Sequence, residues 1–291
     1  MNYRHAFHAG NFADVFKHAA IALVIDHLKR KETPFCVVDT HAGLGRYDLT
    51  ADEAERTGEW REGLGRVLAA KDRPPGMALL LKAVAAVNGG KKPAIKQPPR
   101  WYPGSPRIAR TLLRPRDRLF AAELHPEDSR VLAREFRGDE QTVVKRMDGY
   151  EAIKAWLPPK ERRGLVLVDP PFERKDEFAV MLKGLKDGHR RFATGVFVLW
   201  YPIKDRPPVD AFYKALADSG IRRILAAELL LRPPTDPERL NGCGLIVVNP
   251  PWQFDSDLGR LAVDLATILG AERPAGAKPG RVSAVRWIAE E

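Results

Sequence analysis

Short, wholly apolar runs alternate with amphipathic stretches along most of the chain. Runs of this kind, without polar–apolar alternation, are typical of strands that are covered on both faces. They fall at residues 35–38, 119–122, 142–144, 164–168, 195–200, 224–231 and 244–248. Helical patterns fall at 14–30, 126–136, 150–156, 176–186 and 208–218. Because strands and helices alternate, we expect an α/β fold with a mostly parallel, doubly wound sheet and helices on both faces.

The spacing between the first two strands is unusually long. In a nucleotide-binding βαβ unit, the acidic residue of the second strand follows the glycine-rich loop by about 20 residues. Glu123 follows Gly45 at about four times that distance. Helical patterns at 51–70 and 75–87 fill the gap without a strand pattern, and a basic Pro/Gly-rich connector at 88–106 follows them. We therefore expect a small helical insertion at residues 51–104, placed at the edge of the sheet, between core segments 1–50 and 105–291.

Acidic residues close four successive apolar strands. They are Asp39, Glu123, Asp148 and Asp169. Ligands of open α/β sheets bind just beyond the carboxyl ends of the strands, so these residues mark a candidate site. A single acidic residue at a strand end can be only a turn cap, but four in succession favour ligand binding.

A glycine-rich turn follows the first of these acidic residues. Gly43 and Gly45 allow the backbone to bend sharply and to approach a ligand closely. The third glycine of a dinucleotide fingerprint is absent, so the loop suits a nucleoside ligand without phosphate, such as S-adenosyl-L-methionine. We expect Glu123 to accept hydrogen bonds from a ribose diol, and Asp148, followed by Gly149, to accept one from an adenine amine.

The most specific motif is Asp169-Pro170-Pro171-Phe172. It matches the [D/N/S/H]-P-P-[Y/F/W] pattern of methyltransferases that act on exocyclic amines of bases. The carboxylate of Asp169 and the carbonyl of Pro170 can each accept one N–H of the amine and stabilise the positive charge that develops on nitrogen. Phe172 offers a flat face for an extruded base, worth about 1–3 kcal/mol of stacking. We expect Asp169 to be catalytic, and Pro170 and Phe172 to bind the substrate base.

A second copy of the pattern, Asn249-Pro250-Pro251-Trp252, also follows an apolar strand. Asp169 closes the fourth strand, which lies next to the first in a doubly wound sheet, and further strands follow it. Only a short tail is expected after Asn249, and its amide lacks the charge of a carboxylate. We therefore assign the catalytic role to Asp169 and treat the second copy as a rigid turn.

Charge favours a polyanionic partner. The chain has 48 Lys and Arg against 38 Asp and Glu, a formal net charge of +10. This excess favours nucleic acid first and an anionic membrane surface second. We expect an RNA-facing surface to include the basic residues of the connector and those after the catalytic turn, which are Lys91, Lys92, Lys96, Arg100, Arg174 and Lys175. Such contacts would set affinity and register rather than read sequence.

Other features narrow the class further. The chain has no apolar run of 18 residues and no apolar segment near its start that is typical of a signal peptide. Its two cysteines, Cys36 and Cys243, lie in apolar runs, which fits a reducing cytoplasm. His5 and His8 have no cysteine or carboxylate at ligand spacing nearby, so we expect no metal.

Several motifs together resemble one known family, the bacterial 23S ribosomal RNA adenine-N6 methyltransferases (the RlmJ family). The resemblance runs nearly end to end, and the YRHxFHAGN opening is its most specific part. The motifs are Tyr3-Arg-His-Ala-Phe-His-Ala-Gly-Asn11, Asp14-Val15, Lys17-His18, Asp39-Thr-His-Ala-Gly-x-Gly-Arg-Tyr47, Tyr102-Pro-Gly-Ser-Pro106, Glu123-Leu-His-Pro126, Asp169-Pro-Pro-Phe172 and Leu199-Trp-Tyr-Pro202.

The resemblance implies a class I, Rossmann-like methyltransferase fold, S-adenosyl-L-methionine as methyl donor and a single adenine of 23S rRNA as target. It further implies donor contacts from Lys17 or His18, His41, Ser105, Glu123, Asp148, Gly149 and Asp169. It places Tyr3 close to the target base. Phe172 stands where tyrosine is the commoner residue; this substitution keeps the stacking face and loses a hydroxyl.

Two alternatives remain open at this stage. A DNA adenine-N6 methyltransferase shares the catalytic motif, although the chain has no separate domain large enough to read a DNA site. A catalytically inactive RNA-binding protein on the same scaffold is the other, and the presence of Asp169 argues against it. We expect a cytoplasmic monomer that meets 23S rRNA either naked or in an early assembly intermediate, and no membrane partner.

Overall fold

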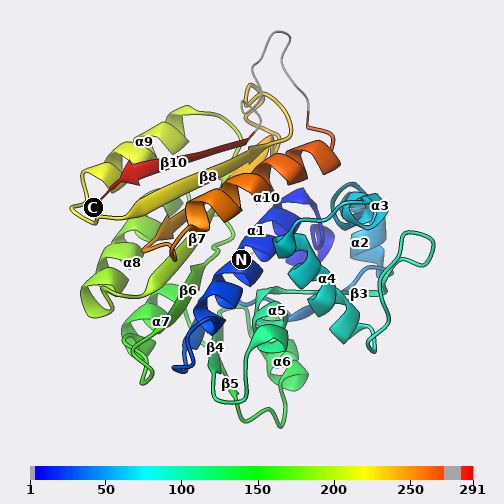
Figure 1. Ribbon diagram of the computed structural model, residues 1–291, viewed down its shortest axis with the longest axis horizontal. Helices are drawn as coiled ribbons and strands as arrows, with labels where there is room; N and C mark the ends of the chain where they lie inside the picture. The colour runs from blue at the N-terminus through cyan, green and yellow to red at the C-terminus, as the bar shows by residue number, and fades with distance from the viewer. Residues whose placement is uncertain (1–3, 272–282, 291) are drawn as a thin grey trace.

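The computed structural model describes residues 4–271 and 283–290. Its centre is an eight-stranded sheet of order β10-β8-β9-β7-β6-β1-β4-β5 (Figure 1). The strands are β1 (Cys36–Asp39), β4 (Arg118–Glu123), β5 (Thr142–Arg146), β6 (Gly164–Val168), β7 (Val196–Ile203), β8 (Ile224–Leu230), β9 (Gly242–Val248) and β10 (Ser283–Ala289).

Strand direction divides the sheet into two parts. The strands β5, β4, β1, β6 and β7 run parallel to one another. Strand β9 lies between β7 and β8 and is antiparallel to both, and β10 is antiparallel to β8. The sheet is therefore mixed and mostly parallel, as the alternating pattern predicts, and its carboxyl edge is set by β1, β4, β5 and β6.

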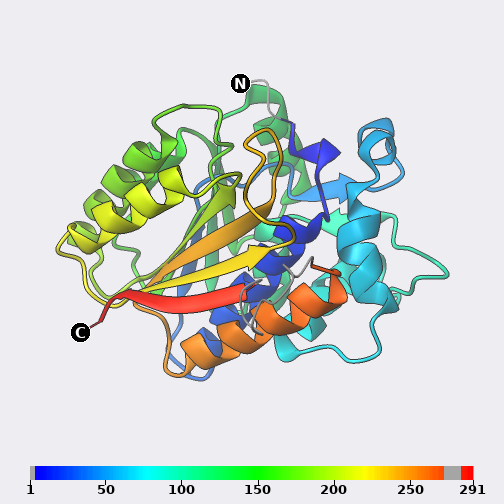
Figure 2. The same ribbon diagram turned by 90° about the horizontal axis from the view of Figure 1, so that it is seen from above.

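Helices cover both faces of this sheet, as expected (Figure 2). One face packs against α1 (Phe12–Lys29), α5 (Ser105–Leu112), α6 (Pro126–Glu135) and α10 (Phe254–Ile268). The other packs against α7 (Gly149–Trp156), α8 (Glu177–Arg191) and α9 (Pro207–Ala217). Side chains of β1 alternate between the two cores: Val37 belongs to the first, and Cys36 and Val38 to the second. The uninterrupted apolar runs follow directly from this double burial.

The segment between β1 and β4 is mainly helical, with α2 (Asp52–Thr57), a π-helical turn η2 (Arg61–Gly65), α3 (Arg66–Ala69) and α4 (Pro75–Val87). It also contains β3 (Trp101–Pro103), which pairs with β2 (Arg46–Asp48) in a two-stranded sheet that the pattern did not indicate. Strands of three residues are too short to produce a recognisable period. Helix α4 packs on α1 and α5 rather than at the sheet edge, where we expected it. The division of the chain at residues 51 and 104 stays a prediction.

The expectation of only a short tail after Asn249 is wrong, because α10 and β10 both follow it. The apolar residues of α10 that are buried, among them Phe254, Leu258, Leu261 and Leu265, do repeat with helical spacing, so the signal was present in the sequence. In the part of the chain that the structure describes, no helix is both long enough and apolar enough to span a bilayer.

Candidate active site

The carboxylate of Asp169 lies at the carboxyl end of β6, next to the end of β1. This confirms the adjacency of the fourth and first predicted strands. The ammonium of Lys17, on α1, donates to Asp169 Oδ2 at 2.6 Å. Both side chains are largely shielded, with exposed fractions of 15% for Asp169 and 5% for Lys17. A charged pair separated by 152 positions in sequence therefore sits at the predicted catalytic position.

A second buried acid, Asp14, holds Lys17 in place. Its Oδ1 lies 3.0 Å from Lys17 Nζ, and its Oδ2 accepts hydrogen bonds from the backbone N–H of Gly10 at 2.9 Å and from His5 Nε2, also at 2.9 Å. Burial alone would raise the pKa of Asp14, but the neighbouring His5 and Lys17 hold it well below its usual value. Burial would likewise lower the pKa of Lys17, but the carboxylates of Asp14 and Asp169 raise it. Lys17 is therefore a permanent cation between two carboxylates.

The Asp169-Pro-Pro-Phe172 turn is strained. Phe172 has a φ of 52°, in the left-handed region that bulky residues rarely occupy. Its ring makes edge contacts with Phe178, at a centroid distance of 5.1 Å, and with Trp200, at 6.0 Å. Lys17 Nζ in turn lies 5.6 Å from the centre of the Trp200 ring. Strain of this kind costs about 1–3 kcal/mol and is found most often at functional sites.

The glycine-rich loop adjoins Glu123, as the strand ends predict. Gly43 and Gly45 have φ values of 61° and 80°, which other residues adopt only at a cost. The backbone N–H of Gly43 donates to Glu123 Oε2 at 2.8 Å, and the N–H of His125 donates to Oε1 at 2.7 Å. Burial raises the pKa of Glu123. The acid is therefore fixed against the loop at the end of β4.

Asp148, Gly149 and His41 meet on the other side of that loop. Asp148 Oδ1 accepts from the N–H of Tyr150 at 2.9 Å and so caps α7, which is the structural role considered for it. A Cβ on Gly149 would lie 2.4 Å from the carbonyl oxygen of Thr40 and 2.7 Å from the ring of His41, so only glycine fits there. Burial lowers the pKa of His41 to about 4, and the imidazole is neutral at pH 7.

Asp39 is the most unusual acid of the group. Its Oδ1 accepts from the backbone N–H of His41 at 3.3 Å. Its Oδ2 is buried and has no hydrogen-bond partner in the described part of the chain. Burial raises the pKa of Asp39 to about 7, against the opposing effect of the nearby Ser105 hydroxyl. Ser105 is itself buried at the start of α5.

Lys17 and His18, which the sequence left as alternatives, point to different partners. Lys17 reaches Asp169, whereas His18 Nδ1 pairs with the Tyr102 hydroxyl at 2.8 Å. Burial lowers the pKa of His18 to about 3, so its ring is neutral. Of the two remaining predicted site residues, Pro170 is buried in the turn after β6, and Tyr3 lies outside the described residues.

The second copy of the motif lies at the amino ends of the parallel strands, opposite the carboxyl ends where Asp169 lies. Because β9 is antiparallel to β7, its carboxyl end, followed by Asn249, lies where β7 begins. The Asn249 amide donates to the carbonyl oxygens of Ala193 at 2.7 Å and Gly195 at 2.9 Å. Trp252 is 82% exposed. The two motifs therefore lie at opposite ends of the sheet's strands because β9 is antiparallel to β7, and not because a short tail follows Asn249.

The surface cations that we expected to face RNA are exposed, but two of them already have acidic neighbours. Arg100 pairs with Asp48 at 2.7 Å, and Arg174 pairs with Asp176 at 3.0 Å. Exposed pairs of this kind are weak and exchange readily with solvent or a polyanion. Within residues 4–271 and 283–290, no group of three or more His, Cys, Asp or Glu side chains is arranged to hold a metal ion.

Sequence reasoning missed the contacts that Asp14 and Trp200 make with Lys17. A signal for the first existed: Asp14, Lys17 and His18 are polar residues within an otherwise apolar helix start, and all three are buried. Buried charged side chains on such a helix need partners. No comparable signal marks Trp200, whose position depends on the pairing of β6 with β7.

Comparison with known proteins gives a consistent result. Residues 32–282 match the family model described as "RsmJ: Ribosomal RNA large subunit methyltransferase D, RlmJ". The chain is 42% identical over 291 residues to "Ribosomal RNA large subunit methyltransferase J" of Escherichia coli, covering 100% of both chains. It is 43% identical over 272 residues to the Haemophilus influenzae protein of the same name, covering 94% of this chain and 95% of that one.

The fold of the chain is also similar to that of a solved structure. The crystal structure of protein LPL1258 from Legionella pneumophila superposes with a TM-score of 0.82 at 30% sequence identity, covering 96% of this chain and 97% of that one. The architecture is the α/β Rossmann-like methyltransferase fold.

Proposed function

The chain belongs to the ribosomal RNA large subunit methyltransferase J family, and from this we propose that it transfers a methyl group from S-adenosyl-L-methionine to the N6 amine of a single adenine in 23S rRNA. The observation that best supports this reaction is the position of the Asp169 carboxylate. It is held by Lys17 and lies in a strained Asp-Pro-Pro-Phe turn at the carboxyl ends of the parallel strands. We further propose that the protein works as a monomer in the cytoplasm, on naked rRNA or on an early assembly intermediate.

The residues around the glycine-rich loop suit the proposed donor. When bound, S-adenosyl-L-methionine supplies an electrophilic methyl on a sulfonium, together with an ammonium group, a ribose and an adenine. The buried, unpartnered Oδ2 of Asp39 is an acceptor that a cationic group would satisfy. We assign the ribose diol to Glu123 and the adenine amine to Asp148, and further donor contacts to Lys17 or His18, His41, Ser105, Gly149 and Asp169.

Asp169 is the residue to which we assign catalysis. Lys17 occupies Oδ2, so Oδ1 is the oxygen that we assign to the N–H of the target amine. The Pro170 carbonyl accepts the second N–H, and Phe172 provides the stacking face. These contacts orient the amine and stabilise the charge that develops as nitrogen rehybridises. Formation of the N–C bond would break the sulfur–methyl bond of the donor, which would leave as a neutral thioether. The methylated nitrogen would then release one proton to solvent, and Asp169 Oδ1 would accept the hydrogen bond from that N–H until the proton leaves.

The experiment that tests this proposal is methyl transfer to defined substrates. Purified protein and labelled S-adenosyl-L-methionine are incubated with protein-free 23S rRNA or with duplex DNA, and the nucleosides are separated by mass spectrometry. We expect label in N6-methyladenosine from rRNA, and none from rRNA with the Asp169→Ala variant. Label in DNA alone would support the DNA methyltransferase alternative, and no label in either would support the inactive RNA-binding scaffold.

A further inference from the structure

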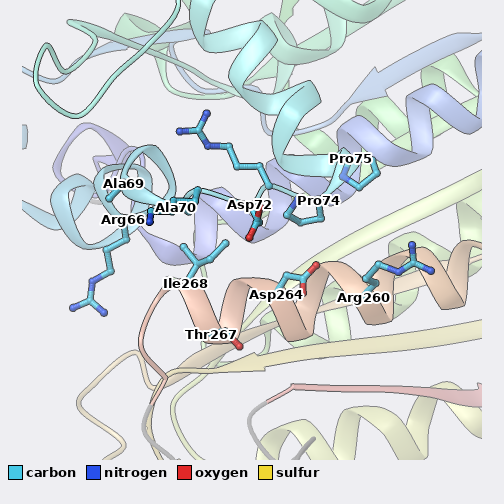
Figure 3. Close-up of a pocket in the computed structure, with 12 residues that line it drawn as sticks. Arg66, Ala69, Ala70, Asp72, Pro74, Pro75, Arg260, Asp264, Thr267 and Ile268 are labelled. Atoms are coloured by element: carbon cyan, nitrogen blue, oxygen red, sulfur yellow. The ribbon is translucent and has the colours of Figure 1, made fainter.

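An open groove lies away from the catalytic turn, between the helical segment that follows β2 and the C-terminal helix. Its volume is about 800 Å³. Figure 3 shows its two walls facing each other: α3 with the connector that leads into α4, and the last turns of α10. The charged side chains that line it are Arg66, Lys71, Asp72, Arg73, Arg260 and Asp264.

Four cations against two carboxylates give this groove an excess of positive charge. Two of the cations are already engaged: Arg66 donates to the Leu269 carbonyl oxygen, and Arg73 donates to that of Leu68 at 2.8 Å. Lys71 and Arg260 extend from opposite walls, and neither has an ion-pair partner among residues 4–271 and 283–290. Lys71 and Arg260 are therefore available to bind an anion, while Arg66 and Arg73 hydrogen-bond to the backbone of the groove walls.

The groove is fixed relative to the active site by direct contacts. The backbone N–H of Leu64, just before α3, donates to the Gly10 carbonyl oxygen at 2.9 Å. The Asn11 amide donates to Glu59 at 3.0 Å, and Asn11 caps α1, the helix that carries Lys17 to Asp169. The other wall is formed by α10. Because β9 is antiparallel to β7, α10 starts at the amino ends of the parallel strands, and its last turns lie towards their carboxyl ends, where Asp169 is found.

The lining favours a nucleic-acid backbone over a base or a free nucleoside. The apolar part consists of Ala69, Ala70, Pro74, Pro75 and Ile268, and the described residues of the lining include no aromatic face on which a base could stack. Uncommitted Lys and Arg side chains are the groups that neutralise phosphates. RNA duplexes are recognised mainly through backbone shape and phosphate contacts, because their bases are hard to reach.

We propose that this groove binds the sugar–phosphate backbone of the RNA substrate at a stretch remote from the methylated base, through Lys71 and Arg260. The inference rests on the proposed function and adds to it a second contact region. Two contacts on a rigid body, one at the extruded base and one at the backbone, would fix the register of the RNA and select one adenine among many.

The test compares single charge removals at matched positions. The variants are Lys71→Ala and Arg260→Ala, with Lys186→Ala as control, because Lys186 is exposed on α8 on the opposite face of the sheet. The dissociation constant for a 23S rRNA fragment is measured by fluorescence anisotropy across a range of salt concentrations. Each groove variant should weaken binding about threefold to tenfold near 0.15 M salt and reduce the salt slope by about 0.7–0.9. The control should match the parent.

A variant that adds a positive charge shows whether weaker RNA binding comes from the lost charge or from unfolding of the alanine variants. Thr267 is exposed and lines the groove, so Thr267→Lys should tighten RNA binding and steepen the salt slope. In methylation assays, Lys71→Ala and Arg260→Ala should raise KM for rRNA and leave kcat unchanged. Groove variants that bind RNA as the Lys186→Ala control does would overturn the inference while methylation of rRNA still stood. Failure of the parent protein to methylate rRNA would instead overturn the proposed function.

Discussion

Replacing Lys17 with methionine tests the buried ion-pair network at the site. Methionine has a similar length and an apolar stem, so the substitution removes the charge and little of the packing. Lys17 and Asp14 are 5% and 2% exposed, so solvent screens their interaction little. Breaking a buried pair by removing one partner costs about 3–5 kcal/mol. We expect Lys17→Met to lose a free energy of unfolding in this range at pH 7.

The pH dependence of this loss identifies its origin. The pKa of Asp14 in the folded protein is below its unfolded value, so its stabilising contribution is present at neutral pH and disappears as the pH falls below about 4. Lys17 is one cause of that lowered pKa, so the deficit of the variant should be full from pH 7 down to about pH 4 and should shrink only below pH 4.

Urea unfolding followed by circular dichroism at pH 7, 4 and 3 measures this deficit. Lys154→Met is the control: Lys154 forms an exposed helix pair with Glu151, and its removal should leave stability unchanged. A deficit at pH 7 no larger than that of the control, or a deficit independent of pH, would refute the reasoning.

Three further substitutions test other parts of the site. Asp39 has a pKa raised to about 7, so the folded protein should lose stability as the pH rises from about 4 through 7. Asp39→Asn should abolish this loss, which amounts to at most about 4 kcal/mol in urea titrations from pH 4 to 8. Asn249→Ala should lower stability by about 1–2 kcal/mol, through lost bonds to Ala193 and Gly195, and leave rRNA methylation intact; a large loss of transfer in a folded variant would mean that we have assigned the wrong motif. Phe172→Leu should keep the fold and weaken binding of the target nucleotide by about 1–3 kcal/mol, measured with a short RNA; unchanged affinity would exclude stacking on this ring.

The apolar pattern of the sequence was sufficient for most of the sheet. Strand β6 and helix α4 have the predicted bounds, and the other predicted strands differ by a few residues at their ends. Full burial on two faces produces uninterrupted runs, which are easily recognised. The acidic strand ends Asp39, Glu123, Asp148 and Asp169 do gather at the carboxyl edge, because parallel strands place their ends together.

Strand direction and long-range partners could not be predicted in the same way. The apolar run of β9 has no polarity, so nothing local indicated that it is antiparallel or that Asn249 lies far from the site. The bond from Lys17 to Asp169 depends on the packing of α1 across the end of β6. The π-helical turn and the pair β2–β3 are too short to leave a periodic signal.

In the proposed mechanism, the carboxylate of Asp169 holds the amine that receives the methyl group. Single-turnover methyl transfer to 23S rRNA, with donor and RNA both saturating, isolates that step from binding. We expect Asp169→Ala to lower the single-turnover rate at least a hundredfold and to change the dissociation constant for RNA less than twofold. A folded Asp169→Ala protein that transfers methyl within tenfold of the parent rate would contradict it.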